Sequence, residues 1–585
     1  MPTLEWIGKE KVINHHMDVP YRVLNRVYSY DLSGQHSEDN GSENKIIHGD
    51  NLEALKSLLP EYAGRIKCIY IDPPYNTGNE NWIYNDNVND PKIKKWLGEV
   101  VGKEGEDLSR HDKWLCMMYP RLRLLHKLLA RDGAIFISID DNELYSLKMV
   151  CDEIFGGNCF VADISWQRTY SMRNDSKGIA AEIEHILVYS KYPGWMPQKL
   201  SRTEGMDSKY KNPDNDSRGA WRNIVASAPN ANTHQGMVYA IQNPITGKYV
   251  YPPQGRCWAL GQDQMLTAMN QWCKYELRNL HDDIERAEIC GVSIEEVRKD
   301  VFAIVLSDTL EVAREQSIKK YKGVLPEFFF SKKGEGTLSR KAYINQVGGR
   351  PVTNFWSFEE TGHTDEASRL LKTLFGGVAV FDTPKPPRLI ERILHIVGDT
   401  DAVILDSFAG SGTTAHAVLN MNRADGGNRK FILIEMEDYA DSITAERVKR
   451  VIHGYGEGKS AVEGTGGDFG FYELGEQLML ENGALNPDMD IQNIRNYIWY
   501  TETKKSLPDR EQDDNKYFLA ADGDVAYYFC YEKDVVTTLD RNFLRTVKTR
   551  AESYIIYADQ CVVSDRELQK HNITFKKIPR DIVSL

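Results

Sequence analysis

The sequence predicts an α/β fold in which an open, mostly parallel β-sheet is covered by helices. Two observations predict it: short apolar runs typical of buried strands, and helical patterns that lie between these runs along the chain. Each run is rich in Ile, Val or Phe and does not alternate cleanly between apolar and polar residues, as expected of strands buried on both faces. The four runs are Ile66–Ile71, Ala134–Ile139, Ala402–Asp406 and Phe431–Glu435.

Three segments carry the helical patterns. Tyr119–Ala130 places Pro120 in a first-turn position, where proline is tolerated, and spaces its leucines along one face. Thr413–Asn422 and Ala440–Ile452 follow the third and fourth strand-like runs. Strands and helices therefore alternate in two separate parts of the chain.

The chain of 585 residues is too long for one hydrophobic core, because cores stop growing near about 250–300 residues. The alternation breaks within 166–376, where the chain is irregular, polar and rich in tryptophan, so we predict an inserted domain there. Residues 1–165 and 377–453 then form the two halves of the sheet domain. A glycine-rich stretch at 454–470 is predicted to be a linker, and 471–585 a small C-terminal domain.

The composition excludes several classes of protein. No apolar run approaches the roughly 20 residues of a membrane helix, and no apolar segment follows the charged N-terminus as in a signal peptide. The nine cysteines are odd in number and contain no C-x-x-C pair, and no H-x-x-x-H pair occurs, so we expect neither a disulfide framework nor a metal site. We therefore expect a protein of the reducing cytoplasm.

The net charge of −13 opposes contacts with phosphate groups, but the charge is unevenly distributed. The stretch 314–350 contains nine basic residues and three acidic ones. A local basic face is therefore available for nucleic acid, although an ordinary solvated surface explains these charges equally well.

A glycine-rich turn, Asp406–Ala415, joins the third strand-like run to a helix. Its first glycine permits a tight turn and its second lets the backbone approach a ligand, while the amides at the helix start favour a negative group. Glu435 ends the next strand and can accept hydrogen bonds from ribose hydroxyls. A nicotinamide dinucleotide and S-adenosylmethionine fit this pattern about equally well. The candidate cofactor-binding residues of the turn are Asp406, Phe408, Ala409, Gly410, Gly412 and Thr413.

A second glycine-rich segment, His453–Ser460, ends in Gly-Lys-Ser as a phosphate-binding P-loop does. That motif requires its first glycine where His453 stands, and no strand precedes the segment. We therefore exclude a P-loop.

The tetrapeptide Asp72-Pro73-Pro74-Tyr75 directly follows the first strand-like run. Two prolines fix a rigid, non-helical turn at the carboxyl end of a strand, where open α/β sheets bind ligands. The Asp72 carboxylate and the Pro73 carbonyl could accept both N–H bonds of an aromatic amine such as that of adenine, and favour a pyramidal, nucleophilic nitrogen. Tyr75 could stack on the base, which would have to leave the duplex. We predict that all four residues are catalytic.

These two motifs resemble those of the DNA amino-methyltransferases. Asp72–Tyr75 is similar to their catalytic motif and Phe408–Gly412 to their F-x-G-x-G cofactor motif, and the order of the two resembles that of the family's β class. Ile46–Leu52 resembles the element before the catalytic strand, Asp132–Asp141 the strand after the catalytic helix, and Phe381–Pro386 the element that leads into the cofactor turn. The resemblance implies a Rossmann-like methyltransferase sheet that uses S-adenosylmethionine, with an inserted target-recognition domain and a small C-terminal domain.

The resemblance also implies roles for further residues. Asp50 and Lys385 would bind the cofactor, and Asp72 would contact it in addition to its catalytic role. Asp at position 72, where relatives that act on cytosine often carry Ser, favours adenine N6 over cytosine N4. A cytosine C5 methyltransferase would need a cysteine nucleophile after a proline, and no Pro-Cys pair occurs.

Three segments resemble one subgroup, the modification (Mod) subunits of type III restriction–modification systems. They are Leu4–Lys9, Trp356–Gly376 and Ile555–Ala558. This resemblance implies binding of double-stranded DNA, a homodimer, and a separate restriction subunit that cleaves DNA and hydrolyses ATP. A solitary methyltransferase that acts on adenine N6 or cytosine N4 is the alternative within the family.

Two other functions, a dehydrogenase and a non-catalytic DNA-binding protein, are alternatives to a methyltransferase. A nicotinamide-dependent dehydrogenase explains the glycine turn and Glu435 but leaves Asp72–Tyr75 without a role. A DNA-binding protein built on an inactive methyltransferase would have no reason to keep Asp72–Tyr75 intact. Methylation of adenine N6 accounts for both motifs.

Overall fold

The computed structural model describes residues 3–77, 110–171, 179–480, 484–508, 515–579 and 582. The chain forms two compact units, which are described separately. Unit 1 comprises Met1–Gln198 and Val352–Leu585, and unit 2 comprises Lys199–Pro351. No helix in the described ranges is long and apolar enough to span a membrane.

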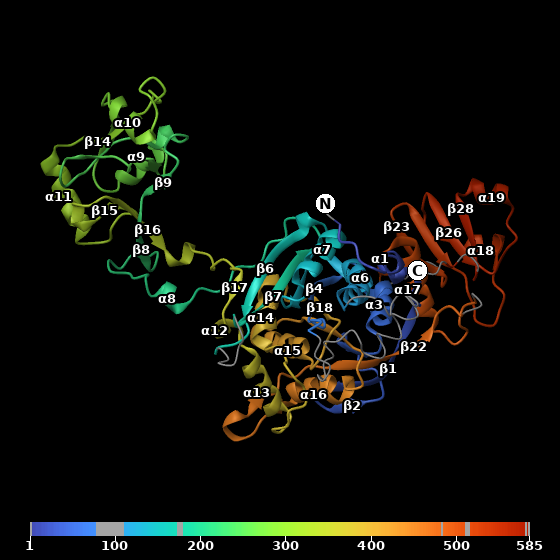
Figure 1. Ribbon diagram of the computed structural model, residues 1–585. Coiled ribbons are helices and arrows are strands. Elements are labelled where there is room, and N and C mark those ends of the chain that lie inside the picture. The colour runs from blue at the N-terminus through green and yellow to red at the C-terminus, as the bar shows by residue number, and fades with distance from the viewer. Residues whose placement is uncertain are drawn as a thin grey trace. The chain divides into compact units, whose positions relative to one another are not determined.

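Unit 1 is built on an eleven-stranded sheet (Figure 1). Its six central strands, β5, β4, β18, β19, β3 and β22, run parallel, and antiparallel pairs flank them on both sides. In sheet order the strands are β17 (Phe355–Trp356), β6 (Phe160–Gln167), β7 (Ile183–Ser190), β5 (Leu129–Ile139), β4 (Ile66–Ile71), β18 (Val403–Asp406), β19 (Lys430–Glu435), β3 (Lys45–His48), β22 (Phe469–Gln477), β1 (Arg22–Asp31) and β2 (Gly34–His36). The α/β fold class predicted from the sequence is therefore confirmed.

The two halves of the sheet meet between β4 and β18. Ile69 of β4 pairs with Leu405 of β18, and Leu405 pairs in turn with Ile432 of β19. All three strands are parallel, so the segments that follow their carboxyl ends lie at one edge of the sheet. The tetrapeptide after β4 and the glycine turn after β18 are thereby brought together, although more than 300 residues separate them in the sequence.

Helices connect and cover the strands of the sheet. They are α3 (Asn51–Tyr62), α6 (Arg110–Leu128), α7 (Leu144–Phe155), α13 (Thr364–Leu374), α14 (Pro387–Val397), α15 (Thr413–Asp425) and α16 (Glu446–His453), with short α1 (Lys9–Val12) and α2 (His15–Asp18) near the start of the chain. The largest core joins β4 and β5 to α3, α6 and α7, and it includes Leu122, Leu125 and Leu129.

Two helix predictions need correction. The helix predicted at Tyr119–Ala130 extends back at least to Arg110, so Pro120 lies inside α6 and not in its first turn. A proline inside a helix costs about 3 kcal/mol, and the burial of Trp114, Met117 and Met118 on the same helix offsets that cost. The helix predicted at Ala440–Ile452 begins with a π-helical turn, Ala440–Ala445, before α16.

The predicted domain boundaries also change. Unit 2 is shorter than the predicted insert 166–376, because β7 pairs with β5 and β6 and β17 pairs with β6 in the main sheet. The predicted linker 454–470 contains β20 (Gly454–Tyr455), β21 (Val462–Glu463) and the start of β22. These pairings depend on distant partners that local composition does not reveal.

The predicted C-terminal domain, 471–585, does not begin at its expected boundary, because β22 belongs to the main sheet. Beyond it, a four-stranded sheet packs with helix α17 (Ile491–Thr503) around cores of its own. Its strands, in sheet order, are β23 (Phe518–Asp522), β24 (Val525–Phe529), β26 (Ser553–Ala558) and β28 (Ile573–Lys577); the remaining short elements are β25 (Thr538–Leu539), β27 (Gln560–Cys561), α18 (Arg541–Thr546) and α19 (Asp565–Lys570). This part of the chain clusters with unit 1.

Unit 2 contains two small sheets around a core rich in Trp and Phe. One sheet is β15 (Phe328–Phe330), β16 (Leu338–Tyr343) and β8 (Trp221–Val225); the other is β11 (Tyr249–Val250), β10 (Ile241–Gln242), β14 (Ala303–Leu306) and β13 (Tyr275–Arg278). The short pair β12 (Arg256–Trp258) and β9 (Ser227–Pro229) and the helices α8 (Glu204–Asp207), α9 (Gln262–Met269), α10 (Asp283–Cys290) and α11 (Leu310–Tyr321) complete the unit.

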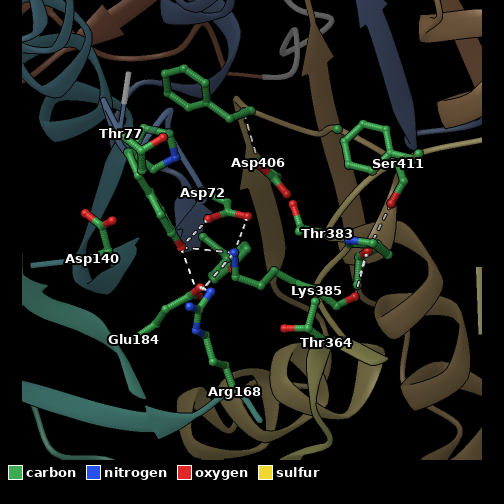
Figure 2. Close-up of a pocket in the computed structure, with 18 of the residues that line it drawn as sticks. Asp72, Thr77, Asp140, Arg168, Glu184, Thr364, Thr383, Lys385, Asp406 and Ser411 are labelled. Atoms are coloured by element: carbon green, nitrogen blue, oxygen red, sulfur yellow. Dashed lines mark hydrogen bonds and ion pairs between the residues drawn. The ribbon is translucent and has the colours of Figure 1, made fainter. Parts of the chain in front are cut away.

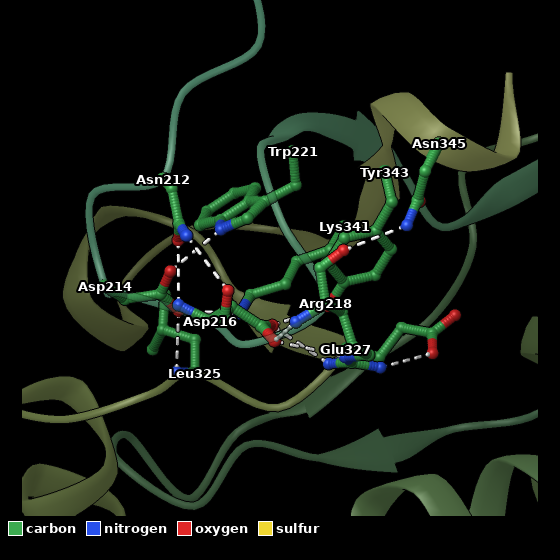
Figure 3. A network of polar contacts seen from close by, with 10 residues as sticks. All are labelled: Asn212, Asp214, Asp216, Arg218, Trp221, Leu325, Glu327, Lys341, Tyr343 and Asn345. Atoms are coloured by element: carbon green, nitrogen blue, oxygen red, sulfur yellow. Dashed lines mark hydrogen bonds and ion pairs between the residues drawn. The ribbon is translucent and has the colours of Figure 1, made fainter.

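A buried ion cluster ties the strands of the first sheet to the loop before β8 (Figure 3). The ammonium of Lys341 lies 2.6 Å from Asp214 and 2.7 Å from Asp216, and the Lys341 side chain is fully buried. Burial opposes ionisation of Asp216, but hydrogen bonds from Arg218, Lys341 and Tyr343 hold the pKa of its carboxyl below the ordinary value. Lys341, counted above among the basic residues of 314–350, is therefore not available to DNA.

We expect Lys341→Ala to lower the free energy of unfolding by about 3 kcal/mol, because it removes the buried cation that Asp214 and Asp216 share and leaves Asp216 with Arg218 as its cationic partner. Denaturant-induced unfolding measures this loss, and Lys320→Ala, at an exposed position on α11, is the control with no expected change. Because the folded-state pKa of Asp216 is depressed, the stabilisation is complete above the ordinary aspartate pKa of about 4 and is lost as pH falls. Equal stability of the two variants would contradict the role of the cluster.

Candidate active site

A cavity of about 490 Å³ lies at the carboxyl edge of the main sheet, where β4 and β18 end (Figure 2). Its volume is within the range of about 300–1,000 Å³ that is usual for ligand pockets. Both halves of the sheet domain line it, so the site forms only when they pair. The predicted site residues that line it are Asp72, Pro73, Tyr75, Lys385, Asp406, Phe408, Ala409, Gly410 and Thr413.

The side of the tetrapeptide that faces away from the cavity is fixed by contacts with the protein core. The carbonyl of Pro74 accepts a hydrogen bond of 2.6 Å from the indole of Trp114 on α6. Asn76 adopts a left-handed backbone conformation with φ of 60°, and its side-chain amide donates to the buried carboxylate of Glu143. Pro74 is therefore anchored in the core, while Pro73 and Tyr75 face the cavity.

Asp72 lies in a connected group of charged side chains. The ammonium of Lys385 is 2.6 Å from one oxygen of Asp72, and the hydroxyl of Tyr75 donates to the other at 2.8 Å. Glu184 on β7 accepts from the Tyr75 hydroxyl at 3.1 Å and lies 3.5 Å from the Lys385 ammonium. Arg168, directly after β6, donates to the second oxygen of Glu184 at 3.1 Å.

The environment of this group favours a charged Lys385 and a Tyr75 that keeps its proton. Burial opposes the charge on Lys385, but Asp72 and Glu184 outweigh it and raise the pKa of the ammonium. Burial and the neighbouring carboxylates raise the pKa of Tyr75 well above its usual value. Burial also raises the pKa of Asp72, and Lys385 opposes that rise. The resemblance implies Lys385 as a cofactor residue, which stays a prediction; in the structure Lys385 lines the cavity and its ammonium lies on Asp72.

The glycine turn is fixed by polar contacts on both of its sides. Asp406, at the end of β18, accepts hydrogen bonds from the backbone N–H of Phe408 and the hydroxyl of Thr414. Burial raises the pKa of the Asp406 carboxyl to about 7. Gly412 has φ of 79°, and a Cβ on it would lie 2.9 Å from the backbone oxygen of Thr444 in the π-helical turn. Only glycine fits this position without strain.

Glu435 and Asp50 lie behind the turn and not in the described lining of the cavity. Glu435 ends β19, accepts from the backbone N–H of Gly410 at 2.7 Å, and has its pKa raised to about 8 by burial. Asp50 follows β3, the neighbour of β19, and caps α3 by accepting from Leu52 and Glu53. Glu435 and Gly412 therefore support the turn, whereas Asp50 stabilises the start of α3.

The polar groups that line the cavity suit a ligand with hydroxyl and amine groups. They include the hydroxyls of Ser411 and Thr413 and the carboxylate of Asp72. Beside the turn, the side-chain amide of Asn51 donates to the backbone oxygen of Ser407, and within the described ranges the Asn51 amide oxygen and the Ser407 hydroxyl are buried without a hydrogen-bond partner. Neither of these two residues belongs to the described lining, so the fit of a nucleoside cofactor rests on the lining groups.

Glu184 and Arg168 were not predicted from the sequence. Both fall in the segment assigned to the insert, and neither belongs to a recognisable motif. The apolar run Ile186–Tyr189, which resembles the other buried strands, was the available signal that this segment joins the sheet.

Comparisons with known proteins agree with this geometry. A family model described as DNA methylase matches residues 66–446. The chain is 29% identical to the StyLTI Mod subunit of a type III restriction-modification enzyme from Salmonella typhimurium, over 84% of this chain and 66% of that protein. It is also 29% identical to the EcoP15I Mod subunit from Escherichia coli, over 77% of this chain and 66% of that protein. The type II methyltransferase M.KpnI from Klebsiella pneumoniae is 31% identical, over 67% of this chain and 81% of that enzyme. The matched regions thus span slightly less than two thirds of the two Mod subunits.

Proposed function

The chain belongs to the DNA methylase family, and we propose that it transfers the methyl group of S-adenosylmethionine to the N6 amine of adenine in DNA. One observation carries the proposal. Asp72 and Pro73, at the end of β4, share a single cavity with the glycine turn at the end of β18. The reaction of a dehydrogenase would give the tetrapeptide Asp72–Tyr75 in that cavity no role.

S-adenosylmethionine, when bound, supplies an electrophilic methyl group on a sulfonium. The backbone of Phe408–Gly410 would approach it, since Gly410 and its neighbours line the cavity. Glu435 does not line the cavity, but it holds the Gly410 N–H beside it, and a carboxylate oxygen can accept a second hydrogen bond; we propose that it accepts from the ribose hydroxyls of the cofactor. Asp50 caps α3 in the segment that follows the neighbouring strand. The resemblance of these residues to the family's cofactor motif supports this assignment.

Asp72 and Pro73 act on the target amine. An ionised Asp72 only accepts hydrogen bonds, and with the Pro73 carbonyl it takes both N–H bonds of the flipped adenine. The nitrogen then becomes pyramidal and its lone pair is directed at the methyl group. Lys385 favours the ionised form of Asp72 through its short ion pair, against the burial that raises the pKa of this carboxyl. Tyr75, which faces the cavity, stacks on the base.

Affinity for S-adenosylmethionine should rise as pH increases from 6.5 through about 8, because of Glu435. Its folded-state pKa is raised to about 8 by burial, and ribose hydroxyls donate best to the ionised carboxylate. Below pH 8 binding must release a proton, which weakens affinity by up to about tenfold per pH unit. Calorimetry at several pH values measures the trend. Glu435→Gln should lose the part of it centred near pH 8, and an unchanged profile would contradict the assignment.

The biological setting that we propose is the modification subunit of a type III restriction–modification system. The two Mod subunits among the relatives support it, and the partners it entails are double-stranded DNA, a second copy of the chain and a restriction subunit. A solitary enzyme that acts on adenine N6 or cytosine N4 is the second candidate, because 81% of M.KpnI, named as a type II methyltransferase, is matched. Gel filtration with and without DNA tests the homodimer.

Labelling identifies the reaction and the base together. Purified protein is incubated with DNA and tritiated S-adenosylmethionine, the DNA is digested, and the nucleosides are separated. The proposal expects label in N6-methyladenine, while label in N4-methylcytosine supports the alternative base. Label at a carbon atom, or none in any DNA, overturns the proposal. Sequencing that detects modified bases then gives the recognised motif.

Unit 2 is our proposed site of target recognition. It carries exposed lysines in the basic stretch noted above: Lys319, Lys320, Lys322, Lys332 and Lys333. Lysines at the surface contact phosphate groups without reading the base sequence, so they would supply affinity.

A further inference from the structure

Four ionisable side chains at the floor of the cavity form one balanced set, here called the charge cluster. It consists of Asp72, Glu184, Lys385 and Arg168, which Figure 2 shows side by side. Two carboxylates face two cations, so the set is neutral when every member is ionised. Among the described residues that line the cavity, Lys385 and Arg168 are the cationic ones. A buried set of charges is stable only while it stays balanced in this way.

Glu184 is the junction of the charge cluster. One of its oxygens faces the Tyr75 hydroxyl and the Lys385 ammonium, and the other faces Arg168. The Glu184 side chain is only 8% exposed, whereas that of Arg168 is 41% exposed at the cavity wall. Asp72 is therefore linked to Arg168 through Glu184. The mechanism proposed above uses Asp72 and Lys385 but gives Glu184 and Arg168 no role.

We propose that Glu184 is a positioning residue which, together with Arg168, sets the charge and the hydrogen bonds of Asp72 during methyl transfer. This inference rests on the proposed function, since it concerns the same reaction. Glu184 acts through Lys385 and Tyr75 and does not itself touch the reacting atoms.

The distances explain how Glu184 acts. Lys385 lies 2.6 Å from Asp72 and 3.5 Å from Glu184, so the two carboxylates compete for one ammonium. Tyr75 likewise donates to both, at 2.8 Å and 3.1 Å. A second negative charge beside Asp72 favours its protonation, whereas Lys385 opposes it. Arg168 forms an ion pair with the other oxygen of Glu184, which weakens the attraction between Glu184 and Lys385. The Lys385 ammonium therefore interacts mainly with Asp72.

The surroundings of Asp72 come from several elements. The groups that face or influence it are Lys385 before α14, Glu184 on β7, Tyr70 on β4, Tyr75 in its own turn, and Asp406 at the end of β18. Among these groups, Glu184 can be neutralised by the isosteric substitution Glu184→Gln, which leaves β4, the tetrapeptide and the glycine turn unchanged. Arg168 is the complementary position, because its loss leaves the charge cluster with one excess negative charge.

The two substitutions should shift the acid limb of the pH–rate profile in opposite directions. Glu184→Gln removes a negative charge, so the pKa of Asp72 should fall and the limb should move to lower pH by about 1 unit. Arg168→Gln leaves Glu184 to compete for Lys385, so the limb should move to higher pH by a similar amount. Single-turnover rates of methyl transfer to DNA between pH 5 and pH 9 measure both shifts.

Two further variants separate charge from shape. Glu184→Asp keeps the charge and should keep the wild-type limb, whatever its effect on the maximal rate. Asp141→Asn removes a negative charge from an exposed position that lines the same cavity, and it should move the limb little because solvent screens it. Calorimetry with S-adenosylmethionine checks that each variant is folded. Should Glu184→Gln fail to fold, the upward shift in Arg168→Gln alone supports or overturns the proposal.

The outcomes are distinct for the two proposals. If the wild-type protein methylates adenine and the two limbs stay in place or move the same way, the role of Glu184 is overturned and the proposed function stands. A limb in Glu184→Asp that matches the one in Glu184→Gln also overturns it, because charge would not be the cause. If wild-type protein transfers no methyl group to DNA, the proposed function fails and this inference fails with it.

Discussion

Asp72→Ala should reduce methyl transfer by about 1,000-fold while binding of S-adenosylmethionine is largely kept. The carboxylate accepts a hydrogen bond that exists only when the target amine is in place, and loss of one such preorganised group costs about 10²–10³ in rate. The substitution also strands the Lys385 ammonium, which lies 2.6 Å from Asp72. The contribution of the glycine turn to cofactor binding is left intact, because Asp72 is not part of that turn.

The measurement pairs two assays on the same protein. Single-turnover transfer to DNA reports the chemistry, and calorimetry reports cofactor binding. Asp141→Ala is the matched control, since Asp141 lines the same cavity at an exposed position and has no contact with Lys385. Full activity of Asp72→Ala would refute the mechanism. Loss of cofactor binding would instead show that Asp72 acts in binding S-adenosylmethionine and not in the chemical step.

Lys385→Met should slow transfer by about 100-fold at pH 7, equivalent to about 2.7 kcal/mol. Without the ammonium, Asp72 loses the cation that opposes its protonation and still faces the charge of Glu184. A protonated Asp72 accepts the amine less well. Because the pKa of Asp72 rises in this variant, part of the activity should return as pH increases toward 9.

A second substitution tests the cause of that loss. Glu184→Gln in the Lys385→Met background restores the charge balance, so the double variant should be faster at pH 7 than Lys385→Met alone. Such a positive coupling identifies electrostatics within one group of contacts. Additive losses would instead show that the Lys385 side chain acts by filling space.

The parts of the site that were predicted share one property: each is encoded in a short contiguous segment. The tetrapeptide after β4 and the glycine turn after β18 are strand-to-loop motifs, and their strands were delimited within a few residues. The family resemblance drawn from these motifs is confirmed by the match over residues 66–446. The structure adds the pairing of β4 with β18, which brings the two motifs together at the carboxyl edge of the parallel sheet, where such sheets bind ligands.

The parts that were missed depend on pairing over long distances. Glu184 lies on β7, which pairs antiparallel with β5, and the local sequence of β7 does not indicate which strand is its partner. The role of Lys385 was assigned by resemblance alone, and its contact with Asp72 arises from the tertiary fold. Lys341 belongs to a basic stretch that suggested a surface cation. In the structure it is buried and paired with two aspartates that precede it by more than 120 residues.

The two ends of unit 2 lie next to each other in the fold. Leu200 and Arg350 exchange two backbone hydrogen bonds of 2.9 Å, so the chain leaves unit 2 beside the point at which it enters. Two recombination crossovers, one near each of these residues, would replace the whole unit and leave the pairing of β4 with β18 untouched. Should unit 2 read the target sequence, as proposed above, such an exchange would change the methylated DNA sequence and keep the catalytic residues.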